Sequence, residues 1–191
     1  MSAVARPPIT KVGALERQIE AAVFLILKGF PPEPIHTLIG ACRGILDGLH
    51  KNTPNKFLAE WNEKILSRVV PGRERDWLFY QNRVANFLKH ADRDPEGVIE
   101  GVNLVALNDI ELQICILAYW EVKRPLHVRI AIGLFYCGLQ NEKWFNFSGF
   151  LSDVGLDPNM LDKYRGQNLE DRNRLMLDAF EMSVANDRGW G

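Results

Sequence analysis

The amino-acid sequence predicts an all-α protein, a helical bundle with a C-terminal helical extension. Apolar residues recur at steps of three and four along most of the 191 residues, as they do in amphipathic helices. Proline and glycine interrupt this periodicity at intervals that suit ordinary helix lengths. The sequence shows no alternation of strand-like and helix-like segments and no internal repeat, so a bundle is the simplest architecture.

Residues 1–10 are predicted to form a flexible tail, and residues 11–122 the main bundle. The first predicted helix has an apolar stripe made of Val12, Leu15, Ile19, Val23, Ile26 and Leu27. Lys28-Gly29 supplies a cation and a glycine stop at its end. Residues 30–34 contain three prolines and are predicted to form a rigid connector. Because this connector is short, the next helix is expected to pack antiparallel to the first.

The second predicted helix buries one apolar side, made of Ile35, Leu38, Ile39, Cys42, Ile45, Leu46 and Leu49. Gly40, Gly44 and Gly48 lower its helix propensity, and they favour the close approach of another helix. Residues 55–68 and 73–91 are predicted to form two further helices. The long segment 102–122 is apolar on more than one face, which is typical of a helix at the centre of a bundle.

Residues 123–191 are predicted to form the helical extension, which packs on the main bundle. Its helices are expected at 126–139 and 169–185, on either side of an aromatic-rich stretch at 142–151. The boundary is placed near residues 122–125, where Arg124-Pro125 ends the long apolar helix.

Composition excludes several classes of protein. The formal net charge is −1, which argues against a protein that coats nucleic acid. The apolar runs are too short to span a bilayer, and the first residues lack a signal-peptide pattern. Three cysteines lie far apart in apolar stretches, namely Cys42, Cys115 and Cys137. This pattern is typical of proteins in a reducing compartment, where cysteines stay free. We therefore expect a soluble cytoplasmic protein, with no metal site, no cofactor and no membrane partner.

The densest polar segment is 82–95. On a helix, Arg83, Asn86, Phe87 and His90 fall at offsets of zero, three, four and seven, which lie on one face. A histidine exchanges protons near neutral pH, and an arginine binds phosphate or carboxylate through paired hydrogen bonds. We therefore predict His90 and Arg83 as catalytic residues. The predicted binding residues are His36, Asn86, Lys89, Asp92, Arg93 and Asp94.

The surroundings of this segment are basic and aromatic. Residues 64–93 contain seven Lys or Arg and three Asp or Glu, which gives a local charge of +4. They are interleaved with Trp77, Phe79, Tyr80 and Phe87, a composition typical of nucleic-acid surfaces. A small anionic ligand or RNA is therefore a candidate partner.

Structural explanations compete with these functional ones. Lysine and histidine near a helix C-terminus are favoured by the helix dipole, and Asp92 and Asp94 can pair with Arg93. Arg83 and His90 would then hold a loop against the bundle. His36 begins the second helix and would meet Asn86 or His90 if that helix packs on 73–91. Two histidines and two aspartates could bind a metal there, but a histidine beside an apolar stripe is more often a core residue.

Two motifs resemble a known family. Ile35-His36-Thr37-Leu38 with Ala41, and the run Asn86-Phe87-Leu88-Lys89-His90-Ala91-Asp92-Arg93-Asp94-Pro95, resemble the "IHTL" and "NFxKHADRDP" motifs of an uncharacterised bacterial all-helical family. The resemblance covers residues 14–120 and implies a helical fold without pointing to an activity.

Arg83, six residues and then His90 also resemble the R-x(4–6)-H motif of HEPN domains. That resemblance implies a small helical dimer that cleaves RNA without a metal. His90 would transfer a proton at the RNA 2′-hydroxyl, and Arg83 would stabilise charge on the phosphate. Val84 departs from the pattern, because HEPN ribonucleases usually place a polar residue there.

The leading functional prediction is a ligand- or partner-binding helical module, with residues 83–94 and His36 as its site. The alternative is a HEPN-like, metal-independent ribonuclease of a toxin or defence system, acting as a homodimer. A third hypothesis is a ligand pocket in the bundle core, in which Arg83 holds an anion.

Overall fold

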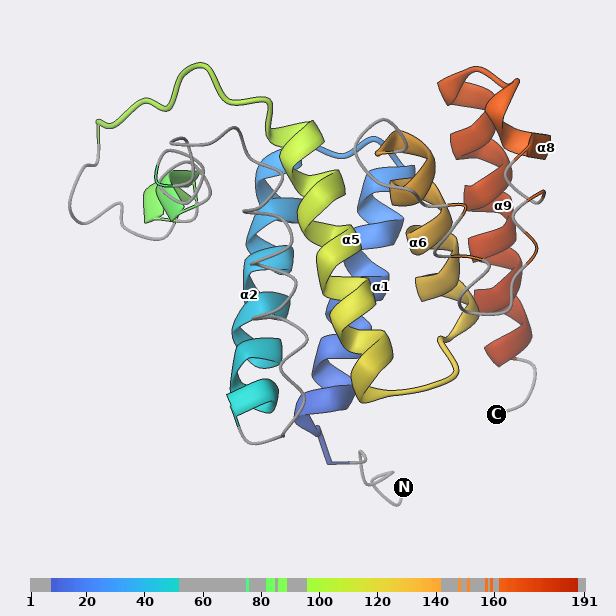
Figure 1. Ribbon diagram of the computed structural model, residues 1–191, viewed down its shortest axis with the longest axis horizontal. Coiled ribbons are helices and arrows are strands. Elements are labelled where there is room, and N and C mark those ends of the chain that lie inside the picture. The colour runs from blue at the N-terminus through green and yellow to red at the C-terminus, as the bar shows by residue number, and fades with distance from the viewer. Residues whose placement is uncertain are drawn as a thin grey trace, which may run out of the picture.

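The computed structural model describes residues 8–51, 75, 82–84, 86–88, 96–141, 148, 151, 157, 159 and 162–188. All regular secondary structure within them is helical, which confirms the predicted all-α class. The elements are α1 (Lys11–Leu27), α2 (Pro32–Lys51), α5 (Leu104–Val122), α6 (Val128–Gln140), α8 (Asp162–Arg165) and α9 (Leu169–Arg188). Helices α2, α5 and α9 begin at the end of the bundle where α1 and α6 end, so α2, α5 and α9 run antiparallel to α1 and α6 (Figure 1).

Helix α1 ends just before Gly29, as the sequence predicted. Gly29 has a φ of 67°, a left-handed conformation that a side chain would disfavour. Its N–H donates to the carbonyl of Ile26 at 2.9 Å, and the N–H of Phe30 donates to the carbonyl of Leu25 at 3.0 Å. These two bonds form a Schellman motif, which satisfies carbonyl groups that a helix end leaves unpaired.

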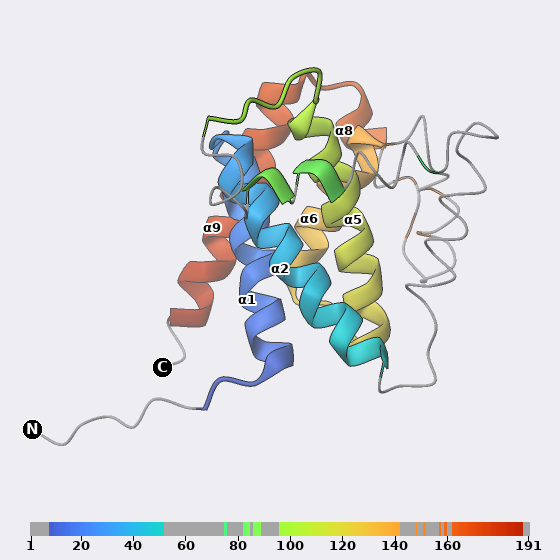
Figure 2. The same ribbon diagram turned by 90° about the vertical axis from the view of Figure 1, so that its left-hand side faces the viewer.

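Helix α2 begins earlier than its sequence predicted. The connector was expected to extend through Pro34, but Pro32 and Pro34 already lie in the first turn of α2. Proline is tolerated there because the first N–H groups of a helix have no carbonyl partner within the helix. The connection is correspondingly tight, and α1 and α2 form the expected antiparallel hairpin (Figures 1 and 2).

Helix α5 occupies the centre of the bundle, as its apolar faces predicted. Twelve of its residues are buried, from Leu107 to Tyr119 with the exception of Ile110. It packs against α2 and α6, and it also contacts α1. Its start is capped by Asn103, whose side chain accepts from the backbone N–H of Ala106. The side chains of this helix therefore reach most of the bundle core.

Helix α6 approaches α1 most closely at Gly133. A Cβ atom at this position would lie 2.3 Å from Cγ2 of Val23, closer than real side chains come. The close approach predicted at the glycines of α2 stays a prediction, because no described residue packs against them. A Cβ at Gly40, Gly44 or Gly48 would meet no described atom within 4 Å.

Helix α9 lies on the side of the bundle opposite α2, where it contacts α1 and α6 (Figure 1). It buries Met176 and Phe180 in the same cluster of side chains that holds the cores of α1, α2, α5 and α6. Side chains from both sides of residues 122–125 thus share one core, and the division there into bundle and extension stays a prediction. No helix among the described residues is long and apolar enough to cross a membrane.

Candidate functional site

The segment that sequence singled out is helical wherever the structure describes it, at 82–84 and 86–88. Val84 is buried, whereas Arg83 and Asn86 are exposed and the Phe87 side chain is 38% exposed. Three of the four residues assigned to one helix face are therefore open to solvent. We call Arg83, Asn86 and Phe87 the Arg83 face.

The remaining predicted residues of this segment lie outside the described residues. They are His90, Lys89, Asp92, Arg93 and Asp94. Their roles as catalytic or binding residues stay predictions. Arg83 is exposed, so it does not line the bundle core, and the hypothesis of an anion held there by Arg83 has no support.

His36 lies elsewhere, inside the bundle. It is 6% exposed, and its Nδ1 is 2.9 Å from Oδ1 of Asn108 on α5. The Asn108 amide nitrogen donates to the carbonyl of Pro32 at 2.8 Å, so Asn108 Oδ1 is the acceptor and His36 Nδ1 carries the proton. These two hydrogen bonds connect the start of α2 to α5. They do not bring His36 to the exposed Asn86, although the predicted binding role of His36 itself stays untested.

Two further buried contacts of α5 use polar side chains. Arg43 of α2 donates to Oε2 of Glu111 at 2.6 Å, and the Glu111 side chain is only 3% exposed. Asn141, just after α6, donates to Gln113 at 3.0 Å. A buried charge or amide is costly without such partners, so these contacts fix how α2 and α6 sit against α5.

Asp109 differs from its polar neighbours on α5. It is 7% exposed, and its Oδ1 has no hydrogen-bond partner within the described parts of the chain. Burial raises the pKa of this carboxyl from 3.8 to about 7. Its charge in turn helps raise the pKa of Tyr136, after burial itself, while Arg172 of α9 acts in the opposite direction. Asp109 therefore lies close to Tyr136, on the side of α5 that packs against α6.

The cysteines behave as small apolar residues, in agreement with their sequence context. All three are free and buried. Burial raises the pKa of Cys42 to about 12 and that of Cys115 and Cys137 well above the ordinary value. A thiol is nucleophilic only as its thiolate, so none of these thiols is activated for catalysis.

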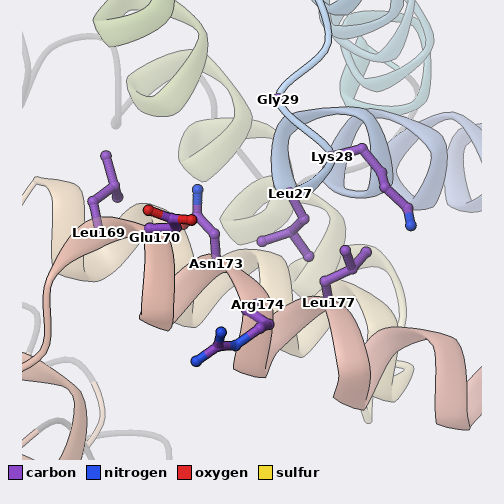
Figure 3. A pocket seen from close by; sticks show the side chains of 8 residues that line it. All are labelled: Leu27, Lys28, Gly29, Leu169, Glu170, Asn173, Arg174 and Leu177. Carbon is purple, nitrogen blue, oxygen red and sulfur yellow. The ribbon is translucent and has the colours of Figure 1, made fainter.

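A groove of about 500 Å³ lies between the end of α1 and the first half of α9 (Figure 3). Its lining is Leu27, Lys28, Gly29, Leu169, Glu170, Asn173, Arg174 and Leu177. The volume falls within the range of small-molecule sites, about 300–1,000 Å³. We call this the α1–α9 groove.

The charged residues of the α1–α9 groove differ in their orientation. Lys28 Nζ is 2.7 Å from Glu181 and 5.6 Å from the centre of the Phe24 ring. Arg174 pairs with Asp171 at 2.8 Å, one turn back along α9. Figure 3 shows both cationic ends pointing away from Leu27 and Asn173, while the Glu170 carboxylate lies beside the Asn173 amide. Glu170 is therefore the charge most available to the groove.

Sequence reasoning passed over the α5 polar residues and the groove. The first had a visible signal, since Asn108, Asp109, Glu111 and Gln113 interrupt the most apolar segment of the chain. The groove had none, because it joins residues more than 130 positions apart. Within the described ranges, no three His, Cys, Asp or Glu side chains gather so as to hold a metal ion.

No protein-family model matches the chain, and neither a curated protein nor a solved structure matches it.

Proposed function

We propose that the protein is a helical binding module, and that the Arg83 face binds single-stranded RNA. The observation that carries the proposal is the joint exposure of Arg83, Asn86 and Phe87 on a segment whose Val84 points inward. A guanidinium, an amide and an aromatic ring then lie together on an accessible helix face. They supply, in that order, a phosphate contact, a base-edge contact and a stacking surface.

The net charge of the whole chain supports a local contact rather than a coating role. At −1, the molecule has no general attraction for polyanions. Affinity must then come from a few side chains, and removing one of them has a measurable effect. A small anionic ligand would use Arg83 alone, whereas RNA would also use Phe87.

The binding test is fluorescence anisotropy with a labelled single-stranded RNA of mixed sequence. Phe87→Ala is expected to weaken binding at least about fivefold, since stacking of a base on an aromatic side chain contributes about 1–3 kcal/mol. Arg83→Gln is expected to weaken it as well. Arg17→Gln, which removes an exposed arginine of α1, is the matched control and should bind like the wild type.

Circular dichroism of each variant separates lost binding from lost folding. If Arg83→Gln and Arg17→Gln weaken binding equally, the attraction is general and the Arg83 face is not the site. If inorganic phosphate binds and depends on Arg83 while RNA does not bind, the partner is a small anion and the RNA proposal is wrong.

A second candidate is RNA cleavage of the kind that the HEPN resemblance implies. The exposure of Arg83 supports it, because the resemblance needs this side chain to reach a phosphate. His90 would then move the proton at the 2′-hydroxyl. Cleavage that persists in EDTA and is lost in His90→Ala, with the thermal melt unchanged, is the expected result. RNA that is bound but stays intact would leave the protein a binding module only.

A further inference from the structure

We propose that the α1–α9 groove binds a small molecule made of an apolar body and a protonated amine. The inference is independent of the proposed RNA contact, because it uses none of the same residues. It rests on the apolar lining of the groove and on how its charges are already paired.

The apolar part of the groove comes from both helices. Leu27 is buried beneath it, Leu177 is half-buried, and Leu169 at the start of α9 is 48% exposed. Leu27 and Leu177 face each other across the groove in Figure 3. A hydrocarbon chain or ring laid between them would remove these side chains from water, and such burial is favourable.

The polar part selects the sign of the ligand's charge. Both cations of the lining are neutralised, Lys28 by Glu181 and Arg174 by Asp171. An anion that approached either cation would be repelled by the carboxylate already beside it. Glu170, by contrast, makes no hydrogen bond or ion pair with any described residue, and Figure 3 shows its carboxylate beside Asn173. The charge that remains open to a ligand is therefore negative, and it complements an ammonium group.

The apolar chain and the charge can be separated with three matched probes: octylamine, octanol and octanoate. Binding is followed by NMR through the methyl signals of Leu27, Leu169 and Leu177 in the intact protein. We expect octylamine to shift these signals at lower concentration than octanol, and octanoate to bind most weakly. The expected preference of octylamine over octanol is about two- to fivefold, the range of an exposed ion pair.

Variants on one helix provide the controls. Glu170→Gln should make octylamine and octanol bind alike, while Asp178→Asn, an exposed acid of α9 outside the groove, should leave the preference unchanged. Leu169→Ala should weaken all three probes, and Leu175→Ala, whose leucine is 42% exposed but outside this groove, should not. All four positions are exposed, so the variants are expected to fold.

Two results would overturn the proposal. If octanoate binds as well as octylamine, the carboxylate does not select the ligand's charge. If none of the three probes shifts the leucine methyl signals at millimolar concentration, the groove is not a ligand site. Failure of RNA binding would not affect either reading, because the Arg83 face takes no part in this assay.

Discussion

At the scale of single residues, the carboxyl of Asp109 is expected to affect the stability of the fold. This carboxyl is buried, and one oxygen has no partner within the described part of the chain. Among the described residues, Tyr136 and Cys137 of α6 interact electrostatically with it, and Arg172 of α9 acts on Tyr136. None of them is a hydrogen-bonded cation for Asp109, so the neutral acid is favoured.

The stability of the protein should therefore fall as pH rises. In the unfolded chain Asp109 loses its proton near pH 3.8, but in the folded chain it holds the proton until about pH 7. Between these values the folded state binds more protons, so its free energy of unfolding decreases with pH. The full effect is on the order of 4 kcal/mol and is reached above pH 7. Denaturant melts from pH 4 to pH 8 measure it.

Asp109→Asn is expected to remove most of this dependence and to be more stable than the wild type at pH 8. Asp178→Asn, at an exposed position of α9, should keep the wild-type slope. A wild-type slope in Asp109→Asn would show that other groups set the pH dependence.

The bond between His36 and Asn108 predicts a second residue-scale effect. Asn108→Ala would leave the His36 ring and the Pro32 carbonyl without their buried partner. The expected loss is about 2–3 kcal/mol in the free energy of unfolding, measured by thermal or chemical denaturation. Thr37→Ala, which removes an exposed hydroxyl of the same turn, should change little. Equal losses in the two variants would mean that the His36–Asn108 bond does not stabilise the fold.

At the scale of elements, replacing a glycine by alanine is expected to change the free energy of unfolding in opposite directions in α6 and α2. Gly133→Ala must push Val23 away, because the new Cβ would lie 2.3 Å from it, and a loss of about 1–3 kcal/mol is expected. Gly44→Ala meets no described atom within 4 Å on an exposed helix position, so a gain of about 0.5–1 kcal/mol is expected. Chemical denaturation of the two variants checks both signs, and a destabilised Gly44→Ala would contradict the open environment of α2.

The bounds of the helices could be predicted from sequence better than the contacts between them. The stripe from Val12 to Leu27 and the glycine after it defined α1 almost to the residue, because local periodicity and capping determine them. The start of α2 was missed because proline marks both connectors and first helical turns. The close approach of α6 to α1 at Gly133 was missed, since the facing residue, Val23, depends on tertiary packing.

For the candidate site as well, the sequence predicted local placement but not contacts between distant residues. A helical repeat was enough to place Arg83, Asn86 and Phe87 on one face, and their exposure agrees with that placement. It was not enough to find the partner of His36, because Asn108 lies 72 positions away in the chain. The sequence around His36 gave no sign of which helix would cover it.

At the scale of the whole molecule, the two proposed sites use different parts of the surface and opposite charges. The Arg83 face offers a cation, and the α1–α9 groove offers the carboxylate of Glu170. With a net charge of −1, neither site gains much from the charge of the rest of the protein. Each interaction must therefore depend on its own residues, which makes single substitutions informative.

The most direct measurement of the central claim is the salt dependence of RNA binding by the wild type and Arg83→Gln. The logarithm of the binding constant falls linearly with the logarithm of salt concentration, with a slope of about −0.7 for each phosphate neutralised on a single strand. We expect Arg83→Gln to make this slope shallower by about 0.7 and Arg17→Gln to leave it unchanged. An unchanged slope in Arg83→Gln would contradict the account, because Arg83 would then contact no phosphate.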